Sequence, residues 1–142
     1  MPRGSIRDTW FPVTLSSAVG DKPVAATLLD TDIVLWRTAD GVAAFPDRCI
    51  HRGTRLSLGR IDGGRLVCPY HGWCFTGDGA VARIPAIPVE RKIPDRMRVA
   101  TYPCMERYGL VYVCLGKPQN PIYDVPEVGQ SGFATHVVGP VH

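Results

Sequence analysis

Hydrophobic residues occur along this chain in runs of three to six residues, separated by pairs and triplets of turn-forming residues. Short runs that are rich in Val, Ile, Leu and aromatic residues and bounded by Gly, Pro or Asp are typical of β-strands. No hydrophobic period of about 3.6 residues persists beyond two turns, so Ser57–Ile61 is expected to form a helical turn at most. The pattern predicts an all-β domain of antiparallel strands, at Trp10–Val13, Val24–Leu29, Ile33–Arg37, Val42–Phe45, Leu66–Cys68, Arg98–Tyr102 and Leu110–Leu115.

Two segments interrupt this pattern. Pro85–Pro94 contains three prolines and is expected to be an extended connector. Residues 116–132 are again rich in Pro and Gly, and Phe133–Val138 has the composition of one more strand. Because the sequence ends shortly afterwards, at His142, we interpret residues 119–142 as a linker and the first strand of a further domain that these residues do not include.

The formal net charge of +3 is too small to indicate a nucleic-acid partner. The basic residues are unevenly spread, because residues 47–65 contain five arginines and two acids. This segment is either a solvated loop face or a docking surface for an acidic protein.

Five cysteines without paired spacing argue against a secreted disulfide scaffold. The N-terminus has no apolar run of the kind found in signal peptides. No stretch approaches the roughly 20 apolar residues of a membrane helix. We therefore expect a cytoplasmic protein without a membrane partner.

The most informative residues lie in two segments, CIHRG at 49–53 and CPYHGW at 68–73. Each segment pairs one Cys with one His, so two facing loops can hold a small cluster from both sides. Thiolates suit one iron, and neutral imidazoles on the other iron raise the reduction potential above that of an all-Cys cluster. The glycine after each His suits a tight loop whose backbone amides point at bridging sulfides. The spacing indicates a [2Fe–2S] cluster with four ligands, Cys49, His51, Cys68 and His71.

A Cys2His2 set also suits a tetrahedral zinc ion. Zinc fingers usually pair Cys with Cys and His with His, whereas each segment here carries one of each, which favours the cluster. Cys74 lies three residues after His71, but the four-ligand set is already complete. We therefore expect Cys74, like Cys104 and Cys114, to be a packed thiol.

With its flanking residues, this motif resembles the N-terminal domain of Rieske non-haem iron oxygenases, the α subunits of ring-hydroxylating and demethylating oxygenases. The resemblance covers roughly residues 9–140 and includes Trp10–Val13, Arg55–Ser57, Phe75–Gly79, Tyr102-Pro103, Glu106–Val113 and Gly139-Pro140. It implies antiparallel sheets with two facing loops at one tip, in a domain at 1–118 whose cluster-binding subdomain spans about 46–84. It places Cys49 and Cys68 on the buried iron and His51 and His71 on the outer iron. Further residues implied to contact the cluster are Arg52, Gly53, Tyr70, Gly72 and Trp73.

Three positions separate this sequence from the Rieske proteins of respiratory complexes. Those proteins carry an extra cysteine in each loop and join the two in a disulfide, whereas the matching positions here are Thr54 and Tyr70. They also have a serine after the second His-Gly that hydrogen-bonds a cluster sulfide, and here Trp73 takes its place. Fewer such hydrogen bonds stabilise the reduced cluster less. We therefore predict a reduction potential near the low end of the Rieske range, about −150 mV.

The resemblance implies that this segment transfers single electrons within an oxidoreductase, a mono- or dioxygenase. One cluster per chain would receive electrons from a flavin reductase or a ferredoxin. It would pass them to a mononuclear Fe(II), expected only in the absent catalytic domain of a neighbouring subunit in an α3 homotrimer. One alternative is a free-standing Rieske-type ferredoxin, although such carriers tend to be shorter and to lack the Trp and the linker. Another is a regulatory or assembly protein that uses the cluster only for stability.

Overall fold

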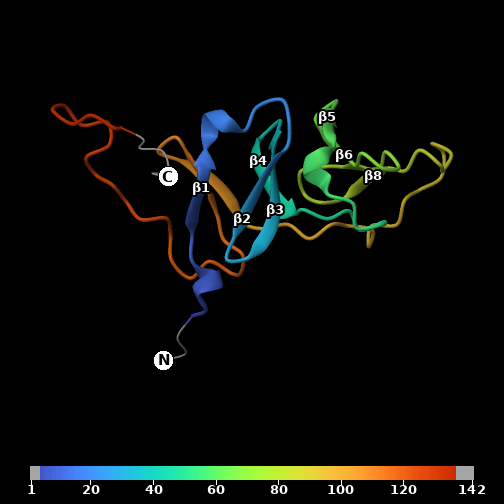
Figure 1. The fold of residues 1–142 in the computed structure, drawn as a ribbon, viewed down its shortest axis with the longest axis horizontal. Coiled ribbons are helices and arrows are strands. Elements are labelled where there is room, and N and C mark those ends of the chain that lie inside the picture. The colour runs from blue at the N-terminus through green and yellow to red at the C-terminus, as the bar shows by residue number, and fades with distance from the viewer. Residues whose placement is uncertain (1–3, 137–142) are drawn as a thin grey trace.

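The computed structural model describes residues 4–136. Within them the chain forms three antiparallel sheets, which follow one another along the long axis of the molecule (Figure 1). Three 3-10 turns accompany the strands: η1 (Ile6–Asp8), η2 (Ser16–Ala18) and η3 (Leu56–Leu58). None of the helices in the described residues is long and apolar enough to cross a membrane.

The first sheet joins the two ends of the domain, in the order β1 (Phe11–Leu15), β10 (Leu110–Val113) and β9 (Cys104–Arg107). The second is a meander of β2 (Val24–Leu28), β3 (Thr31–Thr38) and β4 (Gly41–Pro46). The third lies at the opposite end from β1 in Figure 1 and contains β5 (Arg60–Asp62), β6 (Arg65–Val67), β7 (Cys74–Phe75) and β8 (Val81–Arg83). Sequence neighbours pair throughout the second and third sheets, and the second motif segment, residues 68–73, forms the loop between β6 and β7.

Strand β3 lies between two hydrophobic cores. Ile33 and Leu35 point into one core, shared with β10, while Val34 and Trp36 point into the other, shared with the third sheet. Successive side chains of a strand point to opposite faces, so a strand buried on both faces has a continuous hydrophobic run. The second core includes the fully buried Leu56, Leu66 and Phe75, each worth about 2 kcal/mol by burial. This core also includes Cys49 and Cys68, so it anchors the two motif segments.

The all-β prediction is confirmed, but the strand predicted at Arg98–Tyr102 is wrong. Arg98 and Tyr102 each make a single bridge, and the strand that pairs with β10 is β9. Strand β9 was missed because its Glu and Arg residues form an exposed edge rather than a hydrophobic run. Strands β5, β7 and β8 were missed because each has only two or three residues.

The two remaining local predictions are only partly met. The helical turn expected at Ser57–Ile61 begins one residue earlier, as η3, and β5 follows at Arg60. Of the strand expected at Phe133–Val138, residues 133–136 are not in a strand, and residues 137–138 lie outside the described part of the chain.

Candidate metal centre

The two motif segments form loops of one backbone design. In the first loop the Cys49 amide donates to the Thr54 carbonyl at 2.8 Å, and in the second the Cys68 amide donates to the Trp73 carbonyl at 2.9 Å. Each loop is therefore closed by a hydrogen bond from its Cys to the residue five positions later. Three residues between the Cys and the glycine are left to project outward, and the His is one of them.

The glycine of each loop is required by its backbone conformation. Gly53 and Gly72 both have a φ of +72°, which residues with a side chain adopt only at a cost. Their amides donate to the carbonyls of Cys49 and Cys68, at 2.8 and 3.1 Å. The glycines therefore close the turns through their own amides.

The four predicted ligands meet in two pairs, one of thiols and one of imidazoles. The Cys49 and Cys68 side chains lie against each other in the core, 3% and 2% exposed. The rings of His51, which is half-buried, and His71, which is exposed, lie outside them with centroids 4.7 Å apart. The fold thus places two thiols inside and two imidazoles outside.

Burial and backbone amides act in opposite directions on the pKa of the Cys49 thiol. Burial raises the pKa of the Cys49 thiol to about 11, and the neighbouring Cys68 contributes to the rise. The backbone amides of His51 and Arg52 point at the Cys49 sulfur and act in the opposite direction. Such amides stabilise a thiolate, and a coordinated metal ion deprotonates a thiol outright. These two amides are therefore placed to stabilise the Cys49 thiolate that would form if a metal ion bound.

The imidazoles are held by aromatic neighbours from the second loop. Trp73 stacks on His51, with ring centroids 4.4 Å apart and planes 10° apart. The Tyr70 ring lies 3.8 Å from that of His71. Desolvation lowers the pKa of His51, and the positive charges of His71 and Arg52 lower it further. A neutral imidazole is the form that binds a metal ion.

The other expected residues take different positions. Arg52 is exposed, and its backbone amide, rather than its guanidinium, is directed at Cys49. Cys74 lies on β7 and donates to the Gly72 carbonyl at 3.4 Å, so it is a packed thiol as expected. Cys114 is buried and donates to a backbone carbonyl, whereas Cys104 is partly buried on β9.

One residue pair that braces the first loop was not found from the sequence. The buried carboxylate of Asp47 accepts hydrogen bonds from the amide and the hydroxyl of Ser57, at 2.7 and 2.6 Å. These bonds tie the residue two positions before Cys49 to η3. No local signal separates Asp47 from the exposed acids of the chain, because its burial depends on where η3 folds back.

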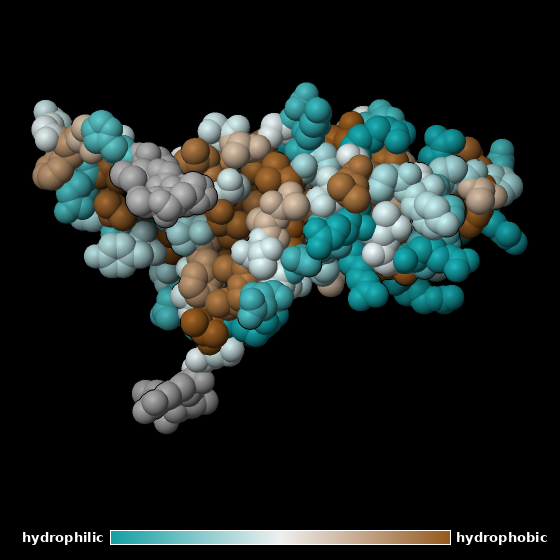
Figure 2. All heavy atoms as spheres, viewed as in Figure 1, coloured by the Kyte–Doolittle hydropathy of each residue, from teal (hydrophilic) through white to brown (hydrophobic). Residues whose placement is uncertain are grey.

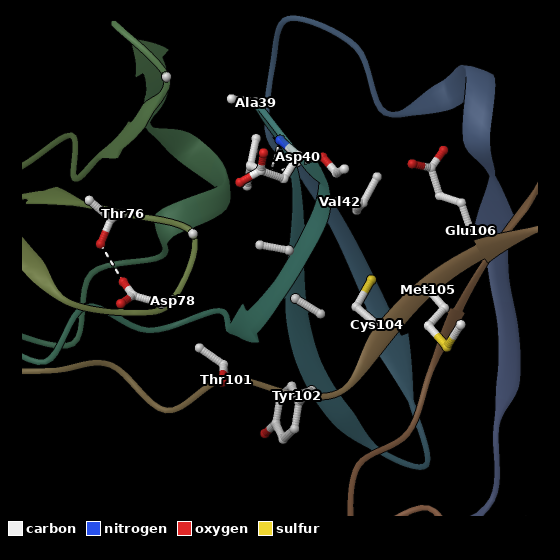
Figure 3. A pocket seen from close by; sticks show the side chains of 16 residues that line it. Ala39, Asp40, Val42, Thr76, Asp78, Thr101, Tyr102, Cys104, Met105 and Glu106 are labelled. Carbon is white, nitrogen blue, oxygen red and sulfur yellow. Dashed lines mark hydrogen bonds between the residues drawn. The ribbon is translucent and has the colours of Figure 1, made fainter. Parts of the chain in front are cut away.

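One hollow of the surface is lined by residues outside the two loops. It has a volume of about 880 Å³ and lies between β4 and β9 on one side and the turn at Thr76–Asp78 on the other (Figure 3). Two of its acids are already paired, Glu106 with Arg37 and Asp78 with Arg98. None of the four predicted ligands lines it, so the candidate metal centre is at the loops.

Comparison with known proteins agrees with this site. A family model described as the Rieske [2Fe-2S] domain matches residues 9–103. The chain is 39% identical to methylxanthine N1-demethylase NdmA from Pseudomonas putida, over 80% of this chain and 34% of the relative. It is 37% identical to the phenoxybenzoate dioxygenase subunit alpha of Ectopseudomonas oleovorans, over 94% and 34%. It is also 39% identical to the chloroplastic protein TIC 55 of Arabidopsis thaliana, over 80% and 22%.

Solved structures show the same relationship. Dicamba monooxygenase bound to dicamba superposes with a TM-score of 0.78 at 34% identity, over 91% of this chain and 40% of the other. NdmA from Pseudomonas putida superposes with a TM-score of 0.73 at 38% identity, over 78% and 35%. The chain thus spans about a fifth to two fifths of the length of these proteins. From the family match, these identities and the shared fold, we conclude that the chain belongs to the Rieske [2Fe–2S] domain family and is homologous to the N-terminal domain of Rieske oxygenase α subunits.

Proposed function

We propose that this segment delivers single electrons to a mononuclear non-haem iron centre of an oxygenase. In this proposal Cys49 and Cys68 bind one iron of the [2Fe–2S] cluster, and His51 and His71 bind the other. The observation that carries the proposal is that the two motif loops pair two buried thiols and two more exposed imidazoles in a chain of this family.

The grouping of the ligands supports a cluster over a single zinc ion. In residues 4–136, no three His, Cys, Asp or Glu side chains converge on one ion position. A tetrahedral zinc site requires four ligands around one ion, whereas each iron of a Rieske cluster takes only two protein ligands. When bound, such a cluster supplies one-electron redox chemistry at a potential raised by its imidazole ligands.

The residues around the ligands have separate tasks in this proposal. The core around Cys49 and Cys68 excludes water from the inner iron position. The exposed ring of His71 is the contact through which an electron leaves, because it reaches the surface. Trp73 covers His51 and fixes the plane of its ring. The segment itself needs no proton transfer, since it only exchanges electrons.

The activity of the whole protein is inferred from the relatives, which include a demethylase, monooxygenases and dioxygenase subunits. We infer a cluster domain at 1–118, then a linker that leads to an Fe(II)-binding catalytic domain. The electron donor is a flavin reductase or a ferredoxin, and the acceptor is the neighbouring subunit of an α3 homotrimer. Because the relatives are oxygenases, the reading as a free-standing ferredoxin has less support. Five free cysteines fit a reducing compartment such as the cytoplasm.

Redox titration of the cluster-loaded chain tests this proposal. The wild type is expected to show a Rieske-type optical and EPR spectrum and a midpoint near about −150 mV. His71→Cys is expected to shift the midpoint toward the roughly −400 mV of all-Cys plant-type clusters, whereas the control His136→Cys leaves it unchanged. A colourless zinc protein contradicts the ligand assignment, and a midpoint above about +100 mV contradicts the low-potential type.

A further inference from the structure

The charge of this protein is concentrated around the two cluster loops. Residues 46–98 contain ten Arg or Lys and five Asp or Glu, whereas the rest of the chain contains six and eight. Hydrophilic side chains cover this end of the molecule, as Figure 2 shows. In residues 4–136, only two of the ten basic residues form ion pairs, Arg55 with Asp32 and Arg98 with Asp78. The cluster end therefore carries a positive field that the fold does not neutralise.

A groove of about 460 Å³ lies within this basic surface. Its lining combines three arginines with apolar side chains, among them Arg65, Arg83, Arg91, Ile84, Ile87 and Val89. None of the three arginines makes an ion pair within the described part of the chain, and Val89 is 86% exposed. Exposed apolar groups beside unpaired arginines are the composition of a protein-binding surface.

The groove adjoins the second cluster loop. Arg83 on β8 lies opposite Cys74 on β7 in the sheet register. Cys74 in turn follows His71 by three residues in the chain. Pro85 packs against this loop, since a Cβ placed on Gly72 would lie 3.2 Å from its Cγ. Ile84, which lines the groove, also belongs to the core that holds both thiols. A protein seated in the groove would therefore lie close to the second cluster loop, although neither His51 nor His71 lines the groove.

We propose that this groove, the Arg65–Arg83–Arg91 groove, docks the acidic face of the protein that reduces the cluster. The proposal rests on the proposed function and adds an entry surface separate from the exit at the imidazoles. Carboxylates of the donor would pair with the three arginines, while Ile87 and Val89 exclude water from the centre of the contact. Each encounter moves one electron, so that the donor, a flavin or iron–sulfur protein, is oxidised by one electron as the cluster is reduced by one. Charge complementarity of this kind acts mainly on the association rate.

Stopped-flow reduction of the cluster-loaded chain by a pre-reduced, acidic plant-type [2Fe–2S] ferredoxin tests the proposal. Electron transfer in this direction is downhill, because plant-type clusters have lower reduction potentials than Rieske clusters. The groove variant, Arg65→Glu with Arg83→Glu and Arg91→Glu, is expected to be reduced at least about tenfold more slowly at low ionic strength. The difference should shrink as salt rises, because the Debye length falls from about 30 Å at 0.01 M to about 3 Å at 1 M.

A matched control variant changes the same charge elsewhere. Arg7→Glu with Lys22→Glu and Lys117→Glu alters three exposed basic residues outside residues 46–98 and should be reduced about as fast as the wild type. Reduction by a small uncharged reductant, photoreduced 5-deazariboflavin, should be equal in all three proteins. If the groove variant loses its cluster, replacement of the same arginines by Gln gives the same comparison with a smaller charge change.

Two results would overturn the docking proposal. Equal slowing of the groove and control variants would show that net charge alone sets the rate, and an unchanged rate in the groove variant would show that the donor binds elsewhere. Both leave the Rieske spectrum of the wild type intact, so they refute the docking surface alone. A wild type without that spectrum refutes the proposed function and the docking proposal together.

Discussion

Asp47→Ala tests whether the carboxylate beneath the first loop holds that loop in place. Asp47 is 7% exposed and accepts two hydrogen bonds from Ser57, at 2.7 and 2.6 Å. Hydrogen bonds to a charged acceptor contribute about 1.5–3 kcal/mol each. Alanine removes both bonds and leaves the Ser57 amide without this partner. We expect a loss of about 3 kcal/mol in the free energy of unfolding, the lower end of that sum, because Ser57 itself is only half-buried.

Thermal unfolding of the cluster-loaded chain, followed by circular dichroism at one scan rate, measures this loss. A loss of about 3 kcal/mol corresponds to a fall of about 10 °C in Tm for a domain of this size. Asp47→Asn keeps one carbonyl acceptor, so its Tm should lie between those of the wild type and Asp47→Ala. The control is Asp32→Ala. It removes an ion pair with Arg55, whose side chains are 55% and 56% exposed, and an exposed hydrogen bond from Thr27, together worth about 1 kcal/mol.

The same samples report on the site. Because Asp47 lies two residues before Cys49, loosening the loop should also speed the loss of visible absorbance in the presence of an iron chelator. A Tm for Asp47→Ala within about 2 °C of that of Asp32→Ala would refute the reasoning. It would mean that the core around the thiols positions the loop without this brace.

Three further predictions concern single residues. Trp73→Ala removes the ring stacked on His51, worth about 0.5–1.5 kcal/mol, so chelators should strip the cluster about 2- to 10-fold faster, with Trp73→Phe near wild type. Gly72→Ala and Gly64→Ala both place a side chain at positive φ, at about 1–2 kcal/mol. Only the new side chain of Gly72→Ala meets a neighbour, a carbon of Pro85 at 3.2 Å, so only this variant should lower cluster occupancy. Equal cluster occupancy in the two variants would contradict this. Burial raises the pKa of Cys104 to about 12. Iodoacetamide at pH 8 should therefore label Cys104 about 10³-fold more slowly than a free cysteine, and the labelling rate should rise tenfold for each pH unit. A labelling rate like that of free cysteine would argue against this burial.

Much of the candidate site was predictable because its information is local. Each loop holds its Cys and His within four residues, so the spacing alone shows which side chains one turn can present together. The glycine requirement is equally local, since it follows from the φ of a single residue, as at Gly53 and Gly72. The all-β architecture was predictable for the same reason, because short hydrophobic runs and turn residues determine strands one at a time.

The features that escaped prediction depend on partners distant in sequence. Strand β9 has only two hydrophobic residues, Cys104 and Met105, and forms because it pairs with β10. The contact of Trp73 with His51 joins two loops, and Asp47 is buried only because η3 folds over it. The arginines that line the groove come from β6, β8 and the connector after β8, and only Arg65 among them belongs to the five arginines noted at 47–65.

The sequence by itself determined the fold class, the four candidate ligands and the family, since each depends on short-range spacing and residue chemistry. The tertiary structure decided which sheet flanks the cluster loops, which thiols are buried and which imidazole reaches the surface. It also decided where unpaired positive charge gathers into a groove. These depend on how strands separated by tens of residues pack on the two faces of β3, and side-chain burial there is a property of the packed sheets rather than of any one segment.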